Sequence, residues 1–177
     1  MESNSADSNT TLAELQVCYL DYDGVLHDDA VFRHPDRGIY IATPGRTLFE
    51  WMPILEGLLQ PYPKVSIVLS TSWVRMRDFE FAKRQLSPAL QARVIGATFH
   101  HREIRKDEFD LMSRCQQILA DVNWRQPKTW FAIDNDNSGW PRHLNAHLVL
   151  TKDRLGLSEL AAQDAVAQVL SSGSSLI

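Results

Sequence analysis

Residues 15–25 read Leu-Gln-Val-Cys-Tyr-Leu-Asp-Tyr-Asp-Gly-Val, and this stretch decides the fold. Its first six residues form a compact, largely apolar run that is typical of a buried strand. Two carboxylates, Asp21 and Asp23, follow the run at alternate positions, which share one side of an extended chain. A bend at Gly24 would let the carboxylate of Asp23 fold back over the end of the strand, toward Asp21. The stretch therefore predicts a buried strand with acidic groups at its carboxyl end.

Short apolar runs alternate with helical patterns through the rest of the chain. Further strands are predicted over residues 65–69, 94–99, 129–133 and 147–150, with a small hairpin over residues 30–40. Helices are predicted over residues 51–59, 75–86, 88–92, 107–122 and 159–170, the last with Ser158 as its N-cap. Strands that alternate with helices indicate a mostly parallel sheet with helices on both faces. We therefore expect an α/β, doubly wound, Rossmann-like fold.

Length and composition indicate one folded domain. The chain has 177 residues, and we expect a single domain over residues 15–170 between a disordered polar tail, 1–14, and a flexible tail, 171–177. Hydrophobic residues make up 44% of the chain and charged residues 23%, which excludes a disordered or low-complexity protein. The net charge of −4 does not suggest a strongly basic nucleic-acid binder.

Targeting signals and cysteine usage bear on where the protein works. Residues 1–14 lack both the positive start and the apolar run of a signal peptide, and no stretch approaches the roughly 20 apolar residues of a membrane helix. The two cysteines, Cys18 and Cys115, lie in apolar segments, which is typical of buried free thiols in a reducing cytosol. We expect a cytoplasmic protein without membrane association, and no obligate protein partner is evident.

Polar residues follow two other predicted strands at the point where each strand ends. Ser70, Thr71 and Ser72 follow residues 65–69, and the acidic stretch 134–136 follows residues 129–133. The carboxyl ends of parallel strands meet at one edge of a sheet, so these groups are expected to gather with the first two carboxylates. Converging carboxylates repel one another unless a cation lies between them, and Mg²⁺ suits a set of oxygen ligands.

The chemistry of such a site favours phosphoryl transfer. A carboxylate beside a metal ion can attack phosphorus to give an aspartyl-phosphate, and a second acid can protonate the leaving oxygen and then activate water. A hydroxyl and a cation are then needed to hold the transferred group. Thr71 offers the hydroxyl, with Ser70 and Ser72 as alternatives, and the basic stretch 100–106 offers the cation.

Three of these segments resemble the motifs of the haloacid dehalogenase (HAD) superfamily of phosphohydrolases. Asp21-Tyr22-Asp23-Gly24-Val25 resembles its first motif, Ile67-Val68-Leu69-Ser70-Thr71 its second, and Phe131-Ala132-Ile133-Asp134-Asn135-Asp136 its acidic fourth motif. Ser70-Thr71-Ser72-Trp73, the stretch that runs on to Gly139-Trp140-Pro141, and residues 150–157 are similar to the HAD domain of Swiss Army Knife RNA repair proteins. The resemblance covers about residues 15–160.

This resemblance implies roles for individual residues. Asp21 would be the nucleophile and a Mg²⁺ ligand. Asp23 would be the general acid and base, with its backbone carbonyl on the metal ion. Thr71 would bind a phosphoryl oxygen, and Asp134 would complete the metal set. The fold implied is HAD-like.

The third motif of the family is a Lys or Arg that precedes the fourth-motif strand. Lys106 is the first choice for this catalytic cation, and Arg105 is the alternative. Gly24, Ser72 and Arg105 are expected to contact the substrate.

The fourth motif departs from the pattern of many relatives, which carry two adjacent acids. Asn135 stands in the second place here, and Asp136 follows it. Either Asp136 replaces the missing acid at the metal ion through a water molecule, or the affinity for the metal is lower.

Some features have a second interpretation. Residues 134–139 fit the first half of an EF-hand loop, but Asn145 replaces the closing Glu and Pro141 interrupts the pattern. His100 and His101 could be a metal pair, but adjacent side chains point apart in a strand, so a loop is favoured.

Aromatic and basic residues near the site motifs are also open to two interpretations. Trp73 and Trp140 could stack on a base or pack within the core. The basic residues of stretch 75–84 could contact phosphate or form an ordinary solvated helix face.

The intervals between the predicted elements leave no room for a large cap domain. An open site suits a large or polymeric substrate, such as a phosphorylated RNA or DNA end, and the resemblance favours that choice. The alternatives are a protein or small-metabolite phosphatase of the same fold, and a catalytically weak module that binds phosphate or a partner.

Overall fold

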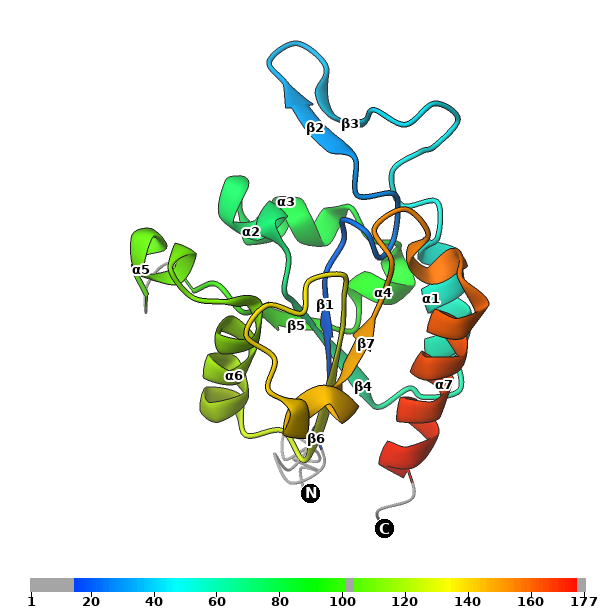
Figure 1. The fold of residues 1–177 in the computed structure, drawn as a ribbon, viewed down its shortest axis with the longest axis vertical. Coiled ribbons are helices and arrows are strands. Elements are labelled where there is room, and N and C mark those ends of the chain that lie inside the picture. The colour runs from blue at the N-terminus through cyan, green and yellow to red at the C-terminus, as the bar shows by residue number, and fades with distance from the viewer. Residues whose placement is uncertain (1–14, 101–103, 175–177) are drawn as a thin grey trace, which may run out of the picture.

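The computed structural model describes residues 15–100 and 104–174, and a five-stranded parallel sheet forms its centre (Figure 1). The strand order is β5-β4-β1-β6-β7, and each neighbouring pair is parallel. The strands are β1 (Gln16–Leu20), β4 (Val65–Leu69), β5 (Val94–Ala97), β6 (Thr129–Asp134) and β7 (Leu148–Leu150). The predicted α/β fold with a mostly parallel sheet is confirmed.

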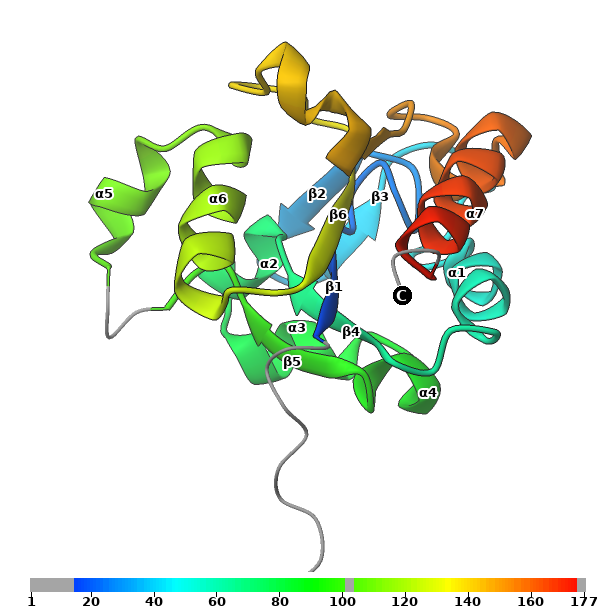
Figure 2. The same cartoon turned by 90° about the horizontal axis from the view of Figure 1, so that it is seen from below.

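Helices cover both faces of the sheet because the buried strands are apolar on both sides. On β1, Cys18 and Leu20 belong to a core cluster with residues of α1 and α7, whereas Val17 and Tyr19 belong to a second cluster with Ile118 of α6. Figure 2 shows α1 and α7 on one side of the sheet and α6 on the other. The helices are α1 (Met52–Leu59), α2 (Ser72–Met76), α3 (Phe79–Arg84), α4 (Pro88–Gln91), α5 (Lys106–Asp110), α6 (Arg114–Arg125) and α7 (Leu160–Ser174), with 3₁₀ helices at Arg142–His147 and Gly156–Ser158.

The register of the central strands aligns their carboxyl ends. Leu20 of β1 lies opposite Leu69 of β4 and Ile133 of β6. Backbone hydrogen bonds continue one residue further, because Asp21 N–H donates to the Ile133 carbonyl at 3.1 Å and Ser70 N–H donates to the Leu20 carbonyl at 2.8 Å. The polar residues that follow these three strands therefore leave the sheet at the same level.

The helix predicted over residues 107–122 is wrong as a single element, since the chain forms α5 and then α6. Ser113 lies between them and begins α6 with a capping box: its side chain accepts from Gln116 N–H, and the Gln116 side chain accepts from Ser113 N–H at 2.8 Å. The apolar spacing continues across the break, which is why periodicity alone joined the two helices. The break makes Arg114 the first residue of α6.

Two other helix predictions need correction. The helix predicted over 75–86 divides into α2 and α3, because Asp78 caps α3 by accepting from Phe81 N–H. Ser158 does not cap α7; its hydroxyl donates to the Leu155 carbonyl, and α7 begins at Leu160. α7 also extends to Ser174, into the segment predicted as a flexible tail. Residues 1–14 and 175–177, predicted as tails, lie outside the described residues, as do 101–103.

The predicted hairpin is present as β2 (Val31–His34) and β3 (Gly38–Ile41), an antiparallel pair between β1 and α1. It stands beyond the carboxyl ends of the strands (Figure 1). This small insertion is in keeping with a HAD-like fold without a large cap.

Cys18 and Cys115 are both buried and free. Over residues 15–100 and 104–174, no helix has the length and apolar character needed to span a membrane.

Candidate functional site

Arg114 joins the ends of three central strands. Its guanidinium Nη2 lies 3.2 Å from Oδ2 of Asp21 after β1, and its Nε lies 3.0 Å from Oδ2 of Asp134 at the end of β6. Its Nη1 donates to the backbone carbonyl of Ser70 after β4 at 2.8 Å. Because Arg114 begins α6, the capping box at Ser113 sets where the guanidinium enters the sheet edge. One partly buried cation thus pairs with two carboxylates that lie far apart in the sequence.

Asp21 and Asp134 are buried, at 4% and 1% exposure. Burial raises the pKa of Asp21; the Arg114 guanidinium lowers it, and the charge of Asp23 raises it. Burial and the charge of Asp21 raise the pKa of Asp134 well above its ordinary value, although Arg114 lowers it. For Arg114, burial lowers the pKa, but the surrounding carboxylates raise it further. The guanidinium therefore stays charged but does not fully offset the acids.

Thr71 lies against Asp21, and a hydrogen bond from its side chain contributes to lowering the pKa of that carboxyl group. Thr71 is also the N-cap of α2, where its hydroxyl oxygen accepts from Trp73 N–H at 3.4 Å. The other two hydroxyls of the motif are placed differently. Ser70 is fully buried and its Oγ has no hydrogen-bond partner within the part of the chain that the structure describes. Ser72 is the first residue of α2 and lines a cleft beside Arg114.

Asp23 extends from the turn that follows β1, with its side chain 21% exposed. Its Oδ1 lies 2.9 Å from Nε2 of His27 and accepts from the indole Nε1–H of Trp73 at 2.9 Å. Gly24 makes the turn with φ +70°, and a Cβ at this position would lie 2.5 Å from the Asn135 side chain. The turn is therefore built on a glycine that packs against the fourth motif.

Asp136 is exposed and accepts from Ser138, through the backbone N–H at 2.7 Å and the hydroxyl at 3.1 Å. Its own backbone N–H donates to Asp134 Oδ1 at 2.9 Å. The Asn135 side chain donates to Asp153 at 3.1 Å. The loop that follows β6 therefore orients Asp134 through its backbone, and a part for the Asp136 carboxylate at a metal ion stays a prediction.

The two residues predicted for the third motif lie away from the carboxylates. Arg105 precedes α5, where its exposed guanidinium pairs with Asp107 at 2.7 Å. Lys106 is the exposed first residue of α5. The structure corrects this prediction by placing Arg114 against Asp21 and Asp134. The pattern Ser113-x-x-Gln116 is a capping-box signature, so the sequence did carry a signal for the helix start that delivers Arg114.

A cleft of about 220 Å³ opens beside Arg114 between α2 and the α5–α6 turn. Arg75 of the predicted basic stretch lines this cleft and pairs with Asp110. Arg77 instead lies over the ring of Phe81, 5.0 Å from its centre. The basic stretch is thus divided between the cleft wall and the helix surface.

The aromatic and histidine interpretations are also settled in part. Trp73 is 1% exposed, so it packs within the core and cannot stack on a base. Trp140 packs near Trp130, with ring centres 6.1 Å apart. His100 lies 3.4 Å from Asp121, and His101 falls outside the described residues.

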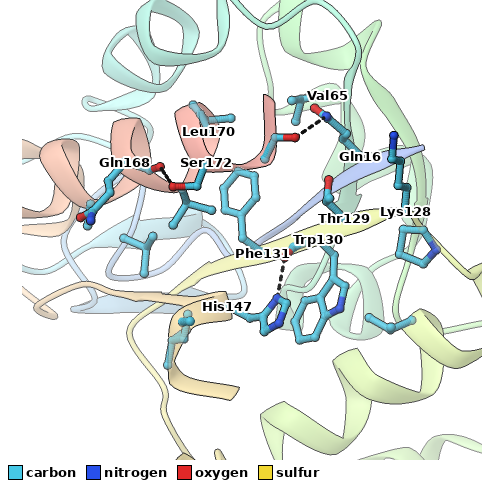
Figure 3. Close-up of a pocket in the computed structure, with 18 of the residues that line it drawn as sticks. Gln16, Val65, Lys128, Thr129, Trp130, Phe131, His147, Gln168, Leu170 and Ser172 are labelled. Carbon is cyan, nitrogen blue, oxygen red and sulfur yellow. Dashed lines mark hydrogen bonds between the residues drawn. The ribbon is translucent and has the colours of Figure 1, made fainter. Parts of the chain in front are cut away.

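A larger hollow of about 990 Å³ lies at the opposite edge of the sheet, at the amino ends of β1 and β6 (Figure 3). Two of the polar side chains that Figure 3 labels there bond within the protein: Gln16 donates to the Gly173 carbonyl, and His147 lies 2.8 Å from the Trp130 carbonyl and stacks on the Trp130 ring. The acidic residues of the motifs lie at the other edge of the sheet. This hollow is therefore not the candidate site, although its volume is larger.

The donor set at the carboxyl edge fits a hard dication. Asp134 Oδ2 is buried and pairs with Arg114 Nε at 3.0 Å, yet burial still raises the pKa of both Asp21 and Asp134, so a further positive charge would stabilise the two carboxylates. Those residues hold no cluster of three or more His, Cys, Asp or Glu side chains that could bind a metal ion. The set implied for this fold needs fewer, because it combines the two carboxylates with the Asp23 backbone carbonyl.

Comparison with known proteins identifies the family of the chain. The model of the HAD domain in Swiss Army Knife RNA repair proteins matches residues 17–162, which include the whole central sheet except Gln16, the first residue of β1. Searches of curated proteins and of solved structures find no match. The family supports a phosphohydrolase of the HAD type. With a match over most of its length, the chain belongs to the family of HAD domains found in Swiss Army Knife RNA repair proteins.

Proposed function

We propose that the protein is a Mg²⁺-dependent phosphohydrolase that forms an aspartyl-phosphate on Asp21. The observation that carries this proposal is the position of Asp21, a buried carboxylate between the Thr71 hydroxyl and the Arg114 guanidinium. A nucleophile in such a place needs donors on either side that can bind the oxygens of a phosphoryl group. The register of β1 and β4 brings Asp21 and Thr71 to the same edge of the sheet, and the start of α6 brings Arg114 there.

The reaction has two steps. In the first, an oxygen of Asp21 bonds to phosphorus while the bond from phosphorus to the leaving oxygen breaks, and Asp23 gives that oxygen a proton. In the second, Asp23 takes a proton from water as the water oxygen attacks phosphorus, and the Asp21 carboxylate is released with inorganic phosphate. Arg114 and Thr71 hold the phosphoryl oxygens through both steps.

The carboxylates of Asp21 and Asp134 and the backbone carbonyl of Asp23 would hold Mg²⁺. When bound, the ion supplies positive charge to the phosphoryl oxygens. The electrostatics of the residues support such an ion, because the pKa of both buried acids is raised although Arg114 pairs with each of them. We propose that Asp136, in the loop that follows β6, contributes through a water molecule.

We propose the phosphorylated end of an RNA or DNA strand as the substrate. The site has no large cap, and the hairpin beside it carries an aromatic and basic surface. Phe32 is 54% exposed, with its ring centre 6.2 Å from that of Tyr40, and the Arg37 guanidinium lies 4.9 Å from the Tyr40 ring. Exposed rings and arginines suit stacking on bases and contact with a phosphate backbone. The family's description as RNA repair proteins supports the same choice.

The test compares phosphate release from oligonucleotides that carry a 3′- or a 5′-phosphate with release from phosphopeptides, in the presence of Mg²⁺. The proposal predicts faster turnover of one oligonucleotide end, loss of that turnover after chelation of the metal, and its abolition in Asp21→Asn. Preference for the phosphopeptide would contradict the substrate, and normal turnover by Asp21→Asn would contradict the mechanism.

A further inference from the structure

Two buried side chains hold the carboxylate of Asp23. Nε2 of His27 lies 2.9 Å from Asp23 Oδ1, and the indole Nε1–H of Trp73 donates to the same oxygen at 2.9 Å. His27 is 0% exposed and Trp73 is 1% exposed, whereas the Asp23 side chain is 21% exposed. The partly exposed Asp23 carboxylate is therefore held by two side chains that are shielded from water.

The second ring nitrogen of His27 fixes where its proton sits. Nδ1 accepts a hydrogen bond from the backbone N–H of Phe49 at 3.1 Å. A nitrogen that accepts carries no proton, so the network assigns the ring proton to Nε2, which then donates to Asp23.

The backbone of Phe49 shows that this arrangement has a cost. Phe49 has φ +60°, in the left-handed region that a bulky residue seldom adopts. Its ring packs edge-on against His27 and Trp73, with centres 4.8 and 5.4 Å away. Such a conformation persists only where the surroundings enforce it, and it occurs most often at functional sites.

Both donors converge on one oxygen of Asp23. Oδ2 receives no hydrogen bond from residues 15–100 or 104–174, so the two oxygens of this carboxyl group are not equivalent. Oδ1 accepts two N–H groups and is a poor place for a proton. When Asp23 is protonated, the proton therefore belongs on Oδ2.

We propose that His27 and Trp73 are positioning residues that make Oδ2 of Asp23 the oxygen that transfers protons. This inference rests on the proposed function. As the bond from phosphorus to the leaving oxygen breaks, Oδ2 gives its proton to that oxygen while Oδ1 keeps both N–H bonds. In the second step, Oδ2 takes a proton from the attacking water. Neither His27 nor Trp73 gains or loses a proton in either step.

The test uses substitutions that separate the two bonds of His27. In His27→Asn, the side-chain oxygen can still accept from Phe49 N–H, but the donor to Asp23 is lost. In His27→Gln, the amide N–H₂ can reach the place of Nε2 and restore the donor. Trp73→Phe keeps an aromatic ring and removes only the indole N–H, which gives an independent variant if the histidine variants fold poorly.

The measurement is kcat/KM for phenyl phosphate and for para-nitrophenyl phosphate, which has the better leaving group. A poor leaving group depends more on a well-placed acid. We expect His27→Asn and Trp73→Phe to lose on the order of tenfold to a hundredfold with phenyl phosphate. The expected loss with para-nitrophenyl phosphate is several times smaller. His27→Gln should recover part of the phenyl phosphate activity.

The outcomes distinguish this inference from the proposed function. Equal losses on the two substrates in the folded variants, or no loss, would overturn the positioning role while leaving the hydrolase intact. A wild type that hydrolyses neither these substrates nor a phosphorylated oligonucleotide in Mg²⁺ would contradict the proposed function and the inference together. Nitrogen NMR gives a readout without turnover: the inference requires the His27 proton on Nε2 and a shift of the Trp73 indole resonance in Asp23→Ala. A proton on Nδ1, or an unmoved indole resonance, would overturn it.

Discussion

The guanidinium of Arg114 lies 3.2 Å from Oδ2 of Asp21, although 93 residues separate the two in the chain. The same guanidinium lies 3.0 Å from Asp134 Oδ2. This contact defines the reactive edge of the sheet better than any sequence motif, because it joins a helix start to the ends of two strands. It also replaces the cation expected from the sequence.

Removing the Arg114 charge should abolish most activity. Arg114→Met leaves the phosphoryl group without its fixed cation, so we expect kcat to fall on the order of a hundredfold or more. Lys106→Met is the matched control, since Lys106 lies exposed at the start of α5 and should leave kcat unchanged. Steady-state phosphate release measures both. A larger loss in Lys106→Met than in Arg114→Met would instead identify Lys106 as the cation that binds the phosphoryl group.

The capping box of α6 should affect activity as well as stability. Ser113→Ala removes the cap next to Arg114 and should cost about 1 kcal/mol of unfolding free energy. Ser87→Ala removes the comparable cap of α4, where Ser87 Oγ accepts from Leu90 N–H. Urea unfolding should show similar losses, whereas kcat should fall only in Ser113→Ala because only that cap positions Arg114. Equal kcat in the two variants would argue that Arg114 is placed without the cap.

Gly24 should tolerate a side chain less well than another glycine of the same conformation. Gly24 and Gly38 both have φ +70°, so alanine at either is strained by about 1 kcal/mol. At Gly24 the new Cβ also meets Asn135, whereas at Gly38 nothing lies within 4 Å. The unfolding free energy should therefore fall further in Gly24→Ala than in Gly38→Ala. Matching losses would show that the Asn135 contact yields without cost.

The raised pKa of Asp134 predicts how stability depends on pH. Its pKa in the folded protein lies above the ordinary value of 3.8, so the folded protein binds the proton more tightly than the unfolded chain. The contribution of Asp134 is therefore most favourable below about pH 4 and is lost as pH rises through the folded pKa. Without divalent cations, Asp134→Asn should be more stable than wild type at neutral pH, and the difference should shrink in acid.

Mg²⁺ should reverse the order of stability of the wild type and Asp134→Asn. Because an ion that binds only the folded state stabilises it, added Mg²⁺ should raise the unfolding midpoint of the wild type more than that of Asp134→Asn. Thermal unfolding with and without Mg²⁺ measures the effect. An equal response of the two proteins would count against Asp134 as a ligand.

Much of the fold could be predicted because its signals are local. The strands β1, β4 and β6 are largely apolar, and the polar residues that follow them mark where each strand ends. The hairpin was visible for the same reason, since His34 to Gly38 supply turn residues between two apolar pairs. Helix breaks were not visible, because apolar spacing continues past Asp78 and Ser113, where a side-chain cap starts a new helix.

The site was predicted in part for a related reason. Strand register places the carboxylates that follow strands, so the sequence predicts that Asp21 and Asp134 lie close together. Arg114 is the first residue of α6, whereas the apolar spacing predicts one helix from residue 107 onward. His27 and Trp73 contact Asp23 through buried side chains. Contacts of that kind depend on tertiary packing, which spacing along the chain does not encode.

The central claim is that Asp21 carries the phosphoryl group. The direct measurement is to mix the protein with para-nitrophenyl phosphate and Mg²⁺, quench rapidly, reduce any aspartyl-phosphate with borohydride, and locate the resulting homoserine by mass spectrometry. We predict conversion of Asp21, with Asp23 and Asp134 unchanged. Release of phosphate by the wild type with homoserine at another aspartate, or at none, would contradict the account.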